Sequence, residues 1–86
     1  MLGRWGGEEF LVVCPSTSLE EALQLAERLR LQLADHCFLT VGQKTASFGV
    51  ASYVPGDSLN SMISRSDKAL YKAKENGRNR VEYIKL

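Results

Sequence analysis

The sequence has few of the residues from which metal centres and disulfide frameworks are built. Among its 86 residues are two cysteines and one histidine. Neither a Cys-x-x-Cys pair nor a histidine cluster is present, and Cys14 and Cys37 both stand beside apolar residues. This pattern favours reduced thiols in a protein core over a disulfide or a zinc site.

Long apolar runs and an excess of one charge are also missing. No apolar stretch approaches the length that spans a membrane and no signal peptide is recognisable, so we expect no membrane segment in this chain. The formal net charge is +1, which gives no bulk reason to expect nucleic-acid binding. Arg65, Lys68 and Lys72 share one helical face, which is most simply a solvated face.

The chain has the composition of one small globular domain. Strand-like and helix-like patterns alternate along it. Phe10 to Cys14 is a continuous apolar run, typical of a strand buried on both faces. Ser18 followed by Glu21 is the pattern of a helix capping box, and Ser58 suits a second cap. The expected elements are a hairpin turn at 6–7, strands at 10–14, 38–41, 46–54 and 80–84, a turn at 42–45, and helices at 19–35 (or 36) and 59–76.

Two adjacent carboxylates follow the glycine pair, in the stretch Gly6-Gly7-Glu8-Glu9-Phe10. A tight turn would place Glu8 and Glu9 at the mouth of a buried strand. Carboxylate oxygens are the ligands that Mg²⁺ prefers, and glycines let a phosphate approach the backbone closely. The alternative is a hairpin with two solvated glutamates, because short motifs are often accidental.

A basic run, from Lys72 to Arg80, surrounds the expected end of the second helix, where Gly77 is placed as a C-cap. Lys74 and Arg78 could clamp a phosphate, lysine as a point charge and arginine as a fork. The alternative is simple complementarity between cations and the helix dipole.

Taken together, three ordered stretches resemble one protein family. Residues 4–10, Arg-Trp-Gly-Gly-Glu-Glu-Phe, resemble the signature of the GGDEF family in its GGEEF form. Residues 47–51, Ser-Phe-Gly-Val-Ala, resemble its "SIGVA" strand, and residues 66–79 resemble its "ADKALYxAKxxGRN" helix. The resemblance covers essentially the whole chain, which is identified as a member of that family.

The resemblance implies the reaction of a diguanylate cyclase, which condenses two GTP molecules into cyclic di-GMP with Mg²⁺ (Mn²⁺ being the alternative ion). It implies that Gly6 and Gly7 border the nucleotide. Glu8 would hold the metal and favour loss of the 3′-hydroxyl proton, and Glu9 would support metal or nucleotide binding. Both glutamates are therefore expected to be catalytic and metal-binding.

The same resemblance assigns the terminal phosphates of GTP to Lys74 and Arg78. Arg28 matches a position that in some members helps to bind product at a secondary inhibitory site; the alternative is an ordinary solvated helix arginine. The expected partners are GTP and a second GGDEF domain in a homodimer, in the cytoplasm where GTP is found, with no nucleic acid.

The implied fold is α+β: the C-terminal half of a nucleotidyl-cyclase or ferredoxin-like palm domain, with a mostly antiparallel sheet and helices packed on it. Residues 1–86 would be a partial GGDEF domain, since a complete domain has roughly as many residues again before the signature. The missing part includes the strand that runs beside residues 10–14, so this strand is expected to lose pairing partners. We expect strand-paired or swapped self-association and an isolated chain that is inactive.

Two other functions remain open. The chain could be a non-catalytic module that binds GTP or cyclic di-GMP, or that mediates dimerisation of a signalling protein. It could also be a ferredoxin-like fold with an unrelated role, because fold does not fix function.

Overall fold

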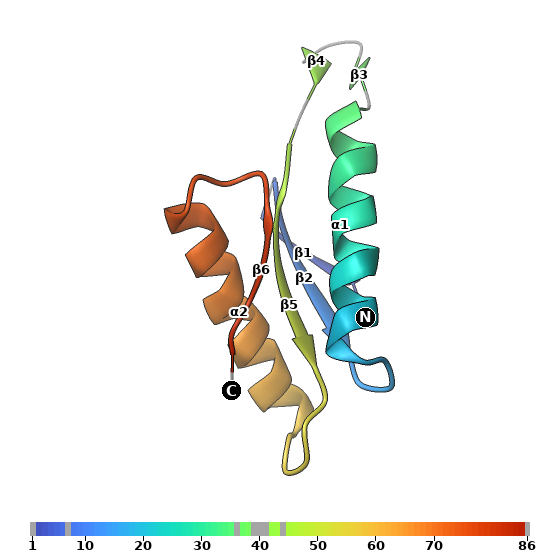
Figure 1. Ribbon diagram of the computed structural model, residues 1–86. Coiled ribbons are helices and arrows are strands. Elements are labelled where there is room, and N and C mark those ends of the chain that lie inside the picture. Colours follow the sequence, from blue (N-terminus) through green and yellow to red (C-terminus); the bar gives the residue numbers. More distant parts are fainter. Residues whose placement is uncertain (1, 7, 36, 39–41, 44, 86) are drawn as a thin grey trace.

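The computed structural model describes residues 2–6, 8–35, 37–38, 42–43 and 45–85. Its elements, labelled in Figure 1, are β1 (Leu2–Gly6), β2 (Glu9–Cys14), α1 (Leu19–Asp35), β3 (Cys37–Phe38), β4 (Gly42–Gln43), β5 (Ser47–Ser52), α2 (Leu59–Glu75) and β6 (Val81–Tyr83). Neither helix in these ranges is long and apolar enough to cross a membrane.

The main sheet is mixed, with the strand order β1-β2-β5-β6. β1 pairs with β2 antiparallel, whereas β2 pairs with β5 parallel and β5 pairs with β6 parallel. The α+β class is confirmed, but the expectation of a mostly antiparallel sheet is wrong. The physical reason is connectivity: α1 lies between β2 and β5, and α2 between β5 and β6, and such helical crossovers join parallel strands.

β2 has a strand on each side. Leu11 faces Gly3 of β1 and Gly49 of β5 in the two ladders. The expectation that this strand lacks pairing partners is therefore wrong for this structure. β6 lies at one edge of the sheet, as its charged and alternating sequence predicted.

The two helices cover opposite faces of the sheet (Figure 1). Because successive strand residues point to opposite faces, β2 divides its side chains between two cores. Val12 and Cys14 pack with Ala22 and Ala26 of α1. On the other face, Val13 packs with residues of β5 and α2, namely Ala51, Met62 and Ile63. The buried thiol of Cys14 is free, as predicted; the side chain of Cys37 lies outside the description.

Gly49 lets α2 approach the sheet closely. A Cβ atom at this position would stand 2.0 Å from the carbonyl oxygen of Ser66 and 2.5 Å from the amide nitrogen of Leu70. Both are backbone atoms of α2, so any side chain at Gly49 would push the helix away. This contact sets the height of α2 above β5.

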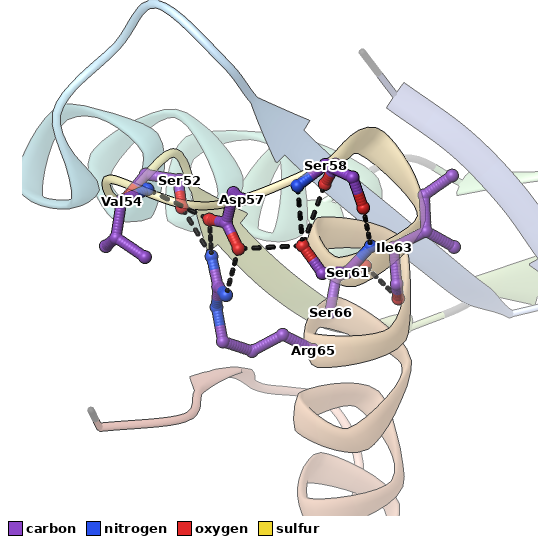
Figure 2. Close-up of polar contacts among 8 residues, drawn as sticks. All are labelled: Ser52, Val54, Asp57, Ser58, Ser61, Ile63, Arg65 and Ser66. Atoms are coloured by element: carbon purple, nitrogen blue, oxygen red, sulfur yellow. Dashed lines mark hydrogen bonds and ion pairs between the residues drawn. The ribbon is translucent and has the colours of Figure 1, made fainter.

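The predicted helix starts are confirmed. The Glu21 amide donates to Ser18 Oγ over 3.2 Å at the start of α1. At α2, Ser58 and Ser61 form a reciprocal capping box, which Figure 2 shows from the side. α1 ends at Asp35, the first of its two predicted limits; His36 lies outside the described residues.

The segment between α1 and β5 differs from the prediction. Gly42–Gln43 is a short strand that pairs with Cys37–Phe38, where a turn was expected over 42–45. Residues 39–41, which belong to the predicted 38–41 strand, lie outside the described residues, as does residue 44. The 46–54 strand is present in shorter form as β5.

Candidate functional site

The sequence-predicted site lies at the end of the sheet where β2, β5 and β6 begin. The Ser47 amide donates to the carbonyl oxygen of Glu8 over 2.9 Å, and the Phe48 amide donates to that of Arg80 over 2.9 Å. These two backbone hydrogen bonds join the glutamate turn, the first residues of β5 and the loop that follows α2. Three segments far apart in sequence therefore form one surface.

The two motifs meet directly through Glu9 and Lys74. Lys74 Nζ donates to Glu9 Oε1 over 3.0 Å, across 65 positions of sequence. Both side chains are partly exposed, 31% for Lys74 and 26% for Glu9. The structure thus brings together a predicted metal ligand and a predicted phosphate ligand, and leaves both accessible from solvent.

The glutamate turn closes the β1–β2 hairpin. Gly6 ends β1 opposite Glu9, and the pairing register shifts between Arg4 and Gly6. Glu8 is exposed in the turn beside Glu9. The predicted hairpin is confirmed by this pairing, while Gly7 lies outside the described residues.

The loop after α2 has an unusual backbone. Gly77, Arg78 and Asn79 have φ angles of 115°, 62° and 47°, all in the left-handed region that glycine adopts freely and other residues adopt at a cost. The Arg78 amide donates to the carbonyl oxygen of Ala73 over 2.9 Å, which is the long-range bond of a Schellman helix ending. Gly77 therefore ends the helix as predicted.

Arg78 points its charge into solvent. Its side chain is exposed, and it has no hydrogen bond or ion pair within the described part of the chain. The structure places it two residues beyond the C-cap Asn76, four residues after Lys74. An exposed guanidinium without a protein partner is available to an anionic ligand.

Another carboxylate at this end of the sheet, that of Glu82 in β6, lies near Lys72 and Arg80. Its oxygens lie 3.6 Å from Lys72 Nζ and 3.6 Å from Arg80 Nη1. Asn76 Nδ2 also donates to Glu82 over 3.2 Å. Glu82 therefore offsets one of the two positive charges of Lys72 and Arg80.

The electrostatics of this end depend on the direction of α2. The helix presents its C-terminus here, and the partial negative charge of that end disfavours anions. Lys72 and Lys74 lie in the last turn and offset it. An anion at this end must therefore be held by side-chain cations.

The carboxylates of this surface can supply only part of a Mg²⁺ site. Within the ranges that the structure describes, no three His, Cys, Asp or Glu side chains are gathered closely enough to hold a metal ion. Mg²⁺ commonly uses one or two carboxylates, with phosphates and water filling its other positions. Glu8 and Glu9 therefore fit an ion that arrives with nucleotide phosphates, and they are too few to hold one tightly alone.

Arg28 is not part of this surface. It is exposed on α1, the helix on the opposite face of the sheet from α2, and it lines a shallow, largely apolar groove on that helix. The side chain has no polar partner in the described ranges. The geometry fits the solvated helix arginine as well as it fits a ligand contact.

Two arginines were missed by the sequence reasoning. Arg30 of α1 donates from Nη1 to Asn79 Oδ1 over 2.8 Å. Its Nε and Nη2 reach the Glu27 carboxylate over 2.6 and 2.9 Å. The side-chain hydrogen bond from Arg30 lowers the pKa of Glu27 and raises that of Arg30. The three-residue spacing of Glu27 and Arg30 could have predicted their ion pair. The contact between Arg30 and Asn79 spans 49 positions, and no sequence pattern predicts it.

The second is Arg65, which was expected on a solvated face. Its side chain is only 13% exposed, and Figure 2 shows its guanidinium beside both Asp57 and Ser52. It donates to both Asp57 oxygens, over 3.0 and 2.8 Å, and to the Ser52 carbonyl over 2.6 Å. The Arg65 hydrogen bond, together with the backbone amide of Val54, holds the pKa of Asp57 well below its usual range.

This cluster corrects the expectation for Arg65 and has a structural role. Asp57 lies just before α2 and its carboxylate is only 6% exposed. By joining the end of β5 to the start of α2, the cluster fixes the helix that carries Lys74. Lys68 on the same helix is exposed, as expected.

Comparison with known proteins identifies relatives over most of the chain. The family model described as "Diguanylate cyclase, GGDEF domain" matches residues 1–80. The chain is 45% identical over 78 residues to diguanylate cyclase DgcM of Escherichia coli, covering 91% of the chain and 19% of that relative. It is 49% identical over 84 residues to diguanylate cyclase VdcA of Vibrio cholerae, covering 91% of the chain and 25% of the relative.

A third relative is diguanylate cyclase A of Treponema denticola, 44% identical over 86 residues, with 95% of the chain and 23% of the relative covered. The chain thus spans about a fifth to a quarter of the length of these relatives. No solved structure gives a significant match.

Proposed function

Because this chain belongs to the GGDEF family of diguanylate cyclase domains, we propose that it supplies one side of a GTP site for the condensation of two GTP molecules into cyclic di-GMP. The observation that carries the proposal is the 3.0 Å contact between Glu9 and Lys74. A carboxylate suited to a metal and an ammonium suited to a phosphate share one partly exposed surface. A metal nucleotide carries both a cation and anionic phosphates, so such a pair of charges is suited to bind it.

Each group of the surface has a role in the proposed site. Glu8 and Glu9 would hold Mg²⁺ together with the nucleotide, and the backbone of Gly6 and Gly7 would border it. The bound ion would neutralise phosphate charge and lower the pKa of a bound oxygen. Within the larger palm fold of a whole domain, this surface would form the metal and phosphate side of the site.

Lys74 and Arg78 would bind the terminal phosphates. In the free chain Lys74 is neutralised by Glu9, so binding exchanges partners: the ammonium turns to phosphate as the carboxylate turns to the metal. Arg78 needs no exchange, because its guanidinium has no partner among the described residues. Proximity of the pair therefore keeps each charge compensated before the nucleotide arrives.

The product contains one guanylate unit from each of two GTP molecules, and each GTP loses its two terminal phosphates as pyrophosphate, so a single site cannot complete the reaction. We propose that two such domains face each other, each holding one GTP, so that the 3′-hydroxyl of one reaches the α-phosphate of the other. A single copy of the domain accordingly forms no product. We propose that the protein acts in signalling in the cytoplasm, where GTP is found.

A second candidate function is a non-catalytic module that binds GTP or cyclic di-GMP, or that mediates dimerisation. The neutralised Glu9–Lys74 pair and the Glu82 cluster favour it, since both can stabilise the fold without any ligand. GTP binding without turnover in an assembled domain would support this alternative.

Calorimetric titration of the chain with GTP and Mg²⁺ tests the proposal. The Glu8→Ala, Glu9→Ala double variant should lose saturable binding. A Glu20→Ala, Glu21→Ala double variant is the matched control, because it removes two adjacent exposed carboxylates from α1. Equal binding by both variants, or no binding by the parent, would count against a metal–nucleotide site in this chain.

A further inference from the structure

The segment Gly77–Asn79, the αL loop hereafter, is held from the opposite face of the sheet. Three consecutive residues take positive φ angles there, and two of them, Arg78 and Asn79, carry side chains. Asparagine tolerates this conformation, but arginine does not favour it. A loop of this kind persists only where surrounding contacts fix it.

One such contact comes from Arg30 of α1. Nη1 of Arg30 donates to Asn79 Oδ1 over 2.8 Å and lies 3.4 Å from the Asn79 carbonyl oxygen. The side chain thus reaches both the backbone and the amide of one loop residue. Figure 1 shows α1 and the loop after α2 on different sides of β6 and β5, so this contact reaches past the sheet edge.

Arg30 is itself immobilised. Its other nitrogens form a two-point contact with the Glu27 carboxylate, at 2.6 and 2.9 Å. The Arg30 side chain is 16% exposed, against 48% for that of Glu27. A planar guanidinium held on one edge by a carboxylate presents its other edge in a fixed direction.

The αL loop is also held from its own side, where the Arg78 amide donates to the Ala73 carbonyl oxygen over 2.9 Å. Arg80 Nε lies 3.4 Å from the carbonyl oxygen of Arg78, and Asn76 is tied to Glu82. These contacts fix the helix end and the first residue after the loop. Among the residues described, only Arg30 forms a side-chain hydrogen bond with Asn79 itself.

We infer that Arg30 is a positioning residue: through Asn79 it holds the αL loop in the left-handed form that presents Arg78 to the phosphates of the nucleotide. The phosphate part of this inference rests on the proposed function. Arg30 does not touch the ligand in this account. It acts through the loop, and Glu27 acts through Arg30.

Amide hydrogen exchange of the free chain tests the clamp without any nucleotide. The Arg78 amide, bonded to Ala73, is the probe. Arg30→Met should speed its exchange roughly tenfold, the effect of losing one charged hydrogen bond, while the amides of β2 and β5 stay unchanged. Arg30→Lys keeps the charge without the fork and should restore the slow exchange only in part.

Lys68→Met is the control for loss of one positive charge, since Lys68 is exposed on α2 and outside the site. It should leave the exchange of the Arg78 amide unchanged. Unchanged exchange in Arg30→Met would overturn the clamp, as would equal acceleration in Lys68→Met. This readout does not depend on nucleotide, so it decides the clamp even if the parent fails to bind GTP and the proposed function falls.

Calorimetry with GTP and Mg²⁺ on the same variants tests the positioning role. Arg30→Met should bind about fivefold more weakly, and Lys68→Met as tightly as the parent. Faster loop exchange with unchanged affinity in Arg30→Met would overturn the positioning role. An equal loss in Lys68→Met would show a net-charge effect and would overturn it too.

Discussion

Replacing Gly49 by alanine should displace α2 and lower stability. The new Cβ would lie 2.0 Å from the Ser66 carbonyl oxygen and 2.5 Å from the Leu70 amide nitrogen. Ordinary contacts of this kind begin near 3.4 Å, so the helix must retreat by about 1.4 Å, the difference of these two values. Retreat would open the packing around Leu70, which is 2% exposed.

The cost follows from the overpacking of a buried contact, about 3 kcal/mol at the upper end of the usual range. Alanine recovers up to ~1 kcal/mol by restricting the unfolded chain. The net loss is then ~2 kcal/mol, or a fall in Tm of roughly 8–16 °C for a domain of this size.

Thermal and urea denaturation measure the effect, with Gly3→Ala as the matched control. A Cβ at Gly3, in β1, meets nothing within 4 Å, so that variant should stay within ~0.5 kcal/mol of the parent. Equal stability of Gly49→Ala and Gly3→Ala would refute the close approach. Because α2 carries Lys74, Gly49→Ala should also weaken GTP binding.

Three further outcomes are expected. Gly77→Ala should cost about 1–2 kcal/mol in urea denaturation, because φ is 115° there and the cost is conformational; an unchanged midpoint would contradict the strain. Lys74→Met should change stability by under ~1 kcal/mol, since its ion pair is partly exposed, yet weaken GTP binding roughly tenfold by calorimetry; equal affinities would remove Lys74 from the site. Arg65 holds the pKa of Asp57 low, so its contribution to stability is present above the ordinary aspartate pKa of about 4 and is lost as pH falls below that value. The stability gap between the parent and Asp57→Asn should therefore be smaller at about pH 3 than at about pH 6, and an equal gap at the two pH values would contradict it.

Local features of the fold could be predicted because they depend on neighbouring residues. The caps at Ser18 and Ser58, the buried strand through Val12 and the helix ending at Gly77 each follow from a few adjacent side chains. The predicted direction of the strands was wrong, although the sequence contained a signal for the correct one. Two strand–helix–strand units predict parallel pairs, and the antiparallel expectation came from the family resemblance.

Long-range contacts of the site could not be read from spacing. Glu9 and Lys74 were expected in one site only through the resemblance, and their contact joins residues 65 positions apart. Arg65 looked like one more cation on a helical face, because its partner Asp57 belongs to the preceding loop. The Arg30–Asn79 contact depends on how α1 packs beside the sheet edge, which no local pattern encodes.

The most direct test of the central claim is product formation by a chimera. Residues 1–80 of this chain would replace the matching segment of diguanylate cyclase DgcM, and cyclic di-GMP would be measured after incubation with GTP and Mg²⁺. The proposed function predicts product from the chimera and none from its Glu8→Ala, Glu9→Ala variant. A folded chimera that binds GTP but forms no cyclic di-GMP would contradict it and favour a non-catalytic module.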